Sequence, residues 1–241
     1  MMKILLNSDL GEAKSFENAS ELLGCVDLVN IGGNFGEGNE ATLRQYVRLA
    51  RERLMQVGAL AGPADGADGG SGTRIFGPRE VVSFLEEAAS SLQRAADGEA
   101  GLVGHVKLRG VLREACDERT DLAEACVDWM EAELEGIPLI VGAGGLLHAV
   151  AEARGVPLLR EICAVRGYAD EARFIPHAEA GALIEDPDEA AQRISAWRAT
   201  GFLSVGGGKQ WLVEAETVCV PADSPRSVEI ARAVRGALAL Q

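Results

Sequence analysis

Short apolar runs alternate with longer amphipathic segments along the whole chain. The apolar runs predict seven strands, at residues 3–6, 28–31, 57–60, 102–107, 138–141, 158–165 and 217–220. Between them, apolar residues recur at helical spacing, as at Leu43, Val47 and Leu54, with arginines on the other faces. This spacing predicts helices at residues 39–54, 78–96, 120–134, 145–154 and 186–199, and a last helix that begins near residue 224.

The alternation of strands and helices is typical of a parallel α/β protein, and no change in composition divides the chain. We therefore expect one domain over residues 1–241. A closed or nearly closed barrel is favoured, and a doubly wound open sheet is the alternative. Residues 61–72 are rich in glycine and predict either a binding loop or lid, or a loop that is simply mobile. The glycines at 206–208 predict turns with positive φ.

Polar side chains follow the first apolar run. Asn7, Asp9 and Glu12 come directly after residues 3–6, and Gly11 allows a turn between them. In parallel α/β proteins, polar groups just past the carboxyl end of a strand border the usual binding crevice. These residues predict a ligand site there, although a solvated surface turn has the same pattern.

Lys107 closes the fourth predicted strand. His105 and Lys107 alternate along that strand, so their side chains point to the same side. If that side is the interior of a barrel, Lys107 is a candidate active-site cation, because a charge that ends a buried strand needs a partner. The alternative is a lysine that reaches out to solvent.

Charge and cysteine usage narrow the class of protein. The formal charge of −14 opposes binding to nucleic acids and to anionic membranes. The five cysteines include no Cys-x-x-Cys pair, and Cys163 and Cys219 lie in apolar runs where core residues are expected. This usage and the absence of an apolar leader predict a cytoplasmic protein.

Common site signatures are absent from the sequence. The glycine clusters do not continue into a phosphate-binding Gly-Lys-Ser/Thr, and no zinc-ligand spacing or nucleophile elbow occurs. We expect no metal site, although the many carboxylates leave a magnesium site open.

Several motifs occur in one order along nearly the whole chain. They are Leu6-Asn-Ser-Asp-Leu-Gly-Glu12, Asn30-Ile31 followed by Phe35 and Gly38, His105-Val-Lys107 followed by Gly110 and Leu112, Glu161, Arg166-Gly-Tyr168, Pro176, Gly181-Ala-Leu-Ile184 and Thr217-Val-Cys-Val220. Through them the chain resembles the LamB/YcsF family, whose characterised activity is that of the 5-oxoprolinase A subunit. The resemblance implies an irregular seven-stranded parallel (β/α) barrel, akin to the deacetylase barrels. It also implies ATP-dependent hydrolysis of 5-oxoproline to glutamate together with partner subunits.

The resemblance assigns roles to individual residues. Asp9 and Lys107 are predicted to be catalytic, with Asp9 as a base or substrate anchor and Lys107 stabilising negative charge. The predicted substrate-binding side chains are Asn7, Glu12, Asn30, Arg109, Glu161 and Arg166. No intrinsic cofactor is expected, and ATP would be handled by the partner subunits.

Departures from the family pattern argue for changed chemistry. Gly36, Leu60 and Arg109 stand where the family has histidines, residues 113–114 replace a Tyr-Asn pair, and Val165 replaces an aspartate. Each lost general acid or base typically costs about two to four orders of magnitude in rate. We expect the parental activity to be lost or altered.

Two hypotheses follow from these observations. The chain is either a divergent hydrolase that acts on a cyclic amide, or a non-catalytic relative that binds a small acidic metabolite or a partner subunit. The sequence does not decide between them, and it leaves open a homo-oligomer.

Overall fold

The computed structural model describes residues 3–10, 16–32, 40–63, 75–97, 103–224 and 226–239. Predictions for Glu12, Gly36, the helix start at Asn39 and residues 64–72 of the glycine-rich loop lie outside these residues.

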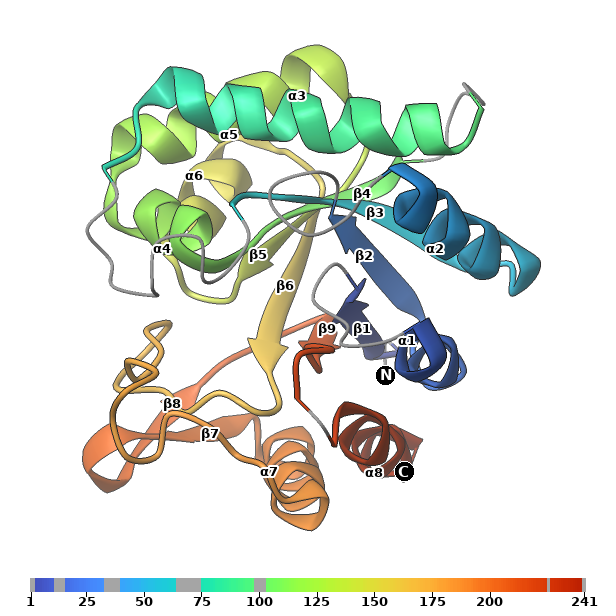
Figure 1. The fold of residues 1–241 in the computed structure, drawn as a ribbon. Coiled ribbons are helices and arrows are strands. Elements are labelled where there is room, and N and C mark those ends of the chain that lie inside the picture. The colour runs from blue at the N-terminus through green and yellow to red at the C-terminus, as the bar shows by residue number, and fades with distance from the viewer. Residues whose placement is uncertain are drawn as a thin grey trace.

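Seven parallel strands close into a barrel, which confirms the predicted fold (Figure 1). The barrel strands are β1 (Leu5–Asp9), β2 (Leu28–Gly32), β3 (Gln56–Ala61), β4 (Val103–Leu108), β5 (Leu139–Gly142), β6 (Leu158–Cys163) and β9 (Thr217–Cys219). They follow one another around the barrel in chain order. β9 closes the barrel because it pairs in parallel with both β6 and β1.

The first strand differs from its prediction. It covers Leu5–Asp9, so that Asn7 and Asp9 lie within β1 and not in a turn after it. Alternation along the strand sends Leu6 into the apolar core and Asn7 to the opposite side, where its amide bonds side chains of other strands. Those hydrogen bonds are what allow a polar side chain with 0% exposure to lie in the barrel.

Eight helices are described around the barrel (Figure 1). They are α1 (Phe16–Leu23), α2 (Glu40–Glu52), α3 (Pro78–Ala95), α4 (Gly110–Glu118), α5 (Thr120–Glu133), α6 (Leu146–Arg154), α7 (Pro187–Thr200) and α8 (Ser227–Ala239). The apolar core lies between them and the outer faces of the strands. In the described part of the chain, no helix combines the length and apolarity that a bilayer span requires.

The helix predicted from residue 186 has the expected start. The Asp186 carboxylate accepts hydrogen bonds from the backbone N–H groups of Asp188 and Glu189, and Pro187 is the first helical residue. Gly201 ends the helix in the left-handed conformation with φ of 77°. Local capping chemistry therefore defines both ends of α7.

The connection from β6 to β9 contains a hairpin that the sequence analysis missed. β7 (Phe202–Val205) and β8 (Lys209–Leu212) pair in antiparallel fashion outside the barrel. Gly207 and Gly208 turn the chain with φ of 68° and 72°, which confirms the predicted positive-φ turn. The short helices α1 and α4 were also missed, since neither carries an extended apolar repeat.

Candidate active site

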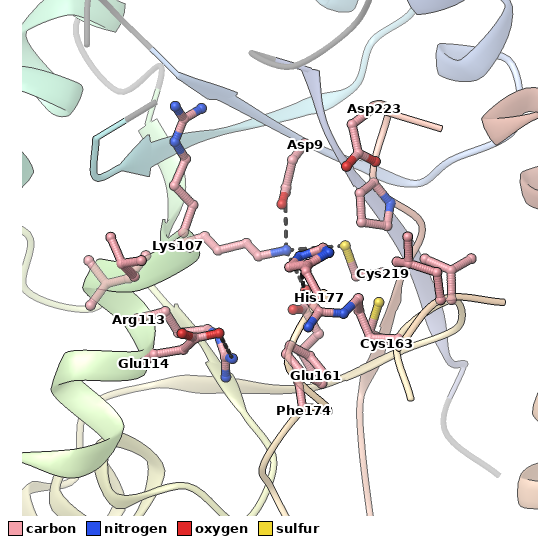
Figure 2. A pocket seen from close by; sticks show the side chains of 18 residues that line it. Asp9, Lys107, Arg113, Glu114, Glu161, Cys163, Phe174, His177, Cys219 and Asp223 are labelled. Carbon is pink, nitrogen blue, oxygen red and sulfur yellow. Dashed lines mark hydrogen bonds and ion pairs between the residues drawn. The ribbon is translucent and has the colours of Figure 1, made fainter. Parts of the chain in front are cut away.

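The ammonium group of Lys107 lies between two carboxylates inside the barrel. Its Nζ atom donates to Asp9 Oδ1 at 3.0 Å and to Glu161 Oε2 at 2.8 Å. It also lies 3.3 Å from Asn7 Oδ1. The Cys219 Sγ atom is likewise 3.3 Å away (Figure 2). Side chains from three barrel strands, β1, β6 and β9, thus converge on the ammonium group that β4 carries.

The surroundings of Lys107 keep it charged. Burial by itself would lower the pKa of Lys107, but the negative charges of Asp9 and Glu161 and the neighbouring Cys219 raise it well above 10.5. One ammonium faces two carboxylates, so the three groups carry an excess negative charge when all are ionised. Such a cluster contributes little net stability to a fold, which makes it a candidate for function.

A chain of amide groups holds the two carboxylates in place. Asn30 Nδ2 donates to Asp9 Oδ1 at 2.7 Å and to Asn7 Oδ1 at 2.9 Å. Asn7 Nδ2 in turn donates to Glu161 Oε2 at 2.9 Å and to Thr217 Oγ1 at 2.8 Å. Both asparagines have 0% exposure, and neither is among the residues that border the cavity. The two asparagines therefore orient the charged groups without bordering the cavity themselves.

His105 completes the chain of hydrogen bonds. Its Nε2 atom lies 2.7 Å from Asn30 Oδ1, which can only accept, so that Nε2 carries the proton. Burial and the nearby charge of Lys107 lower the pKa of His105 to about 4, an effect that Asp9 partly offsets. The imidazole is therefore neutral at pH 7, and its Nδ1 atom has no hydrogen-bond partner among the described residues.

A cavity of about 230 Å³ opens beside Lys107. Its polar lining residues are Asp9, Lys107, Arg109, Arg113, Glu114, Glu161, Cys163, Arg166, His177, Cys219 and Asp223. The volume suits a small metabolite and is below the range usual for drug-sized ligands.

Two arginines flank an aromatic ring at this cavity. The guanidinium carbons of Arg113 and Arg166 each lie 4.6 Å from the ring centre of Phe174. Arg166 donates to Ile175 O at 2.8 Å and bonds His177 Nε2 at 2.7 Å. Arg113 is paired with a carboxylate, whereas no carboxylate among the described residues pairs with Arg166, whose pKa burial lowers. Arg166 is therefore the better receptor for an anionic ligand.

Arg109 both borders the cavity and makes a hydrogen bond to the backbone. Its side chain borders the cavity with 8% exposure. The Nε atom donates to the carbonyl oxygen of Pro63 at 2.8 Å. This hydrogen bond ties the Arg109 side chain to the backbone that follows β3.

The cavity gathers five predicted site residues, namely Asp9, Lys107, Arg109, Glu161 and Arg166. Sequence reasoning missed the participation of His177, Phe174 and the two cysteines. The cysteines are buried, as expected, yet they also border the cavity. Alternation from Glu161 to Cys163 along β6 was a usable signal, since both side chains point to one side.

Among the described residues, no group of three or more His, Cys, Asp or Glu side chains is arranged to hold a metal ion. The expectation that no metal takes part stays a prediction.

Comparisons with known proteins agree with this architecture. The family model of the LamB/YcsF family matches residues 4–241. The chain is 33% identical to the 5-oxoprolinase A subunit of Nitrobacter hamburgensis, over 98% of this chain and 94% of that protein. It is 30% identical to the 5-oxoprolinase A subunit of Streptomyces avermitilis, over 97% and 94% of the two chains.

A solved structure is similar as well. The crystal structure of a lactam utilization protein from Thermus thermophilus superposes with a TM-score of 0.86 and 29% identity, over 98% of this chain and 96% of that one. The match of the family model over nearly the whole chain, together with the relatives and this structure, shows that the protein belongs to the LamB/YcsF family.

Proposed function

We propose that this protein is a hydrolase similar to the 5-oxoprolinase A subunit, which binds a small cyclic amide acid and opens its ring by chemistry altered from that of its relatives. The observation that carries the proposal is the Lys107 ammonium held between Asp9 and Glu161 at the cavity. The names of the relatives, which are 5-oxoprolinase A subunits, supply the substrate class.

In the proposed mechanism, the carboxylate of the substrate binds Arg166. The lactam carbonyl then lies near Lys107, whose positive charge stabilises the oxyanion that forms when the carbonyl is attacked. Asp9 accepts a proton from the attacking water and passes it to the ring nitrogen, which then leaves as an amine. Glu161 holds Lys107 in position throughout.

The use of ATP is assigned to partner subunits. Opening an unstrained lactam is coupled to ATP hydrolysis in the reaction that the resemblance implies. We propose that other subunits supply that step, and that this chain supplies the lactam-binding barrel.

The test is ATP-dependent release of glutamate from 5-oxoproline by the purified protein, alone and with partner subunits. Turnover should disappear in Asp9→Asn and in Lys107→Met. Lys209→Met is a matched control, because Lys209 is exposed on β8, away from the cavity. Turnover that survives both site substitutions would contradict the assigned roles.

A second candidate function is binding without catalysis. It is favoured by Leu60, a buried apolar side chain with 1% exposure, and by Arg109, which bonds Pro63. Both stand where the resemblance implies histidines. Calorimetry that shows saturable binding of 5-oxoproline, with no glutamate released in the complete mixture, would support this candidate and exclude the first.

A further inference from the structure

Two thiols lie side by side at the cavity. Cys163 ends β6 and Cys219 ends β9, and the two residues are register partners in the parallel pairing of these strands. Neighbouring strands are spaced by about 4.8 Å, which lies within the Cα separation of about 4.4–6.8 Å that a disulfide accepts. Their strand positions therefore permit a bond between the two sulfurs.

This pair is set apart from the other cysteines of the chain. Cys163 and Cys219 have 4% and 2% exposure, and both border the cavity (Figure 2). Cys116 and Cys126 have 0% exposure on α4 and α5 and do not border it. Cys25 is partly exposed near the end of α1. A small reagent in the cavity therefore contacts Cys163 and Cys219 and none of the other three cysteines.

The pKa values of the two thiols are shifted in opposite directions. A hydrogen bond from Cys219 outweighs burial and lowers the pKa of Cys163, with help from the backbone N–H of Val165 and the charge of Lys107. The same hydrogen bond and burial raise the pKa of Cys219, although Lys107 opposes this. Cys163 is thus the nucleophile of the pair, and Cys219 keeps the proton that stabilises it.

We propose that Cys163 and Cys219 form a dithiol modification site that reacts with hydroperoxides, with Cys163 as the attacking thiol and Cys219 as the resolving thiol. The inference rests on the arrangement of the pair and does not require the proposed lactam reaction.

The chemistry balances with one hydroperoxide as the oxidant. The Cys163 thiolate attacks the peroxide, the O–O bond breaks, and a molecule of water or alcohol leaves after it takes up a proton. The Cys219 sulfur then attacks the Cys163 sulfenic acid, the S–S bond forms and the S–O bond breaks. The hydroxide that leaves takes the proton of Cys219 and becomes water. The product joins β6 to β9 and removes the thiol that lies 3.3 Å from Lys107.

The test uses the full chain, fully reduced and then treated with hydrogen peroxide. We expect an intact mass lower by two hydrogens, and a peptide map that contains a Cys163–Cys219 disulfide. Cys116→Ser is the matched control and should form the same disulfide. Cys219→Ser should stop at a sulfenic acid that dimedone traps on Cys163, whereas Cys163→Ser should yield neither product.

Other outcomes would overturn the inference. They are a disulfide that involves Cys25 while the pair stays reduced, or peroxide consumption that is equal in the wild type and in Cys163→Ser. A second measurement needs no variant. Iodoacetamide should label Cys163 of the folded wild type at least about tenfold faster than Cys116 or Cys126, and equal labelling of the three would refute the proposed reactivity.

Discussion

Acidification should destabilise the barrel through His105. The folded protein holds this imidazole with a pKa of about 4, against an ordinary value of 6.5. A group whose pKa is lower in the folded state stabilises the fold fully above the unfolded value and loses that contribution as the pH falls. The window is therefore pH 6.5 down to about 4.

The size of the effect follows from the same values. The difference of about 2.5 units, at about 1.4 kcal/mol per unit, corresponds to about 3 kcal/mol of unfolding free energy. The structural cause is plain. A second proton would go to Nδ1, which is buried without a hydrogen-bond partner among the described residues, while Lys107 adds like charge nearby.

The assay is urea unfolding of the wild type and of His105→Gln at several pH values from 7 to 4. Glutamine keeps an amide donor for Asn30 Oδ1 and does not titrate. Because every other group titrates in both proteins, the difference between the two curves isolates His105. The wild type should lose about 3 kcal/mol more than the variant over this range. Parallel curves would refute the reasoning.

Three further predictions concern the site and its support. Lys107→Met should lower the unfolding free energy at pH 7 by about 3–5 kcal/mol, because two buried carboxylates lose their cation. Lys209→Met should change it little, and urea or thermal unfolding measures the stability of both variants. Gly58→Ala should destabilise the protein by about 1–3 kcal/mol, because an added Cβ would lie 2.0 Å from the His105 ring. The NMR signals of His105 should also shift, and an unchanged spectrum would contradict the close contact. Arg166→Gln should weaken calorimetric binding of 5-oxoproline by about tenfold or more, through loss of a charged hydrogen bond, and equal affinity would remove Arg166 from the ligand site.

Part of the site was open to sequence reasoning. Asp9, Lys107, Glu161 and Arg166 all border one cavity, and each stands in a motif of the family resemblance. The alternation of His105 and Lys107 correctly predicted that both side chains point to the same side, and the structure shows that this side is the barrel interior. Local rules succeed here because strand periodicity fixes the side to which a side chain points.

Other features depended on contacts that no local pattern encodes. The turn assigned after β1 proved to be strand, because Asn7 and Asp9 find partners on other strands. The β7–β8 hairpin and α4 also escaped prediction, since short elements are stabilised chiefly by packing against the rest of the protein.

The sequence by itself determined the seven strands of the barrel, the parallel α/β class and the family resemblance, because apolar runs and ordered motifs are local properties of the chain. Only the tertiary structure decided which side chains meet. β9 closes the barrel between β6 and β1, and this closure brings Cys219 beside Cys163 and Lys107. Register across strands sets such neighbours, and register arises from the packing of the whole barrel.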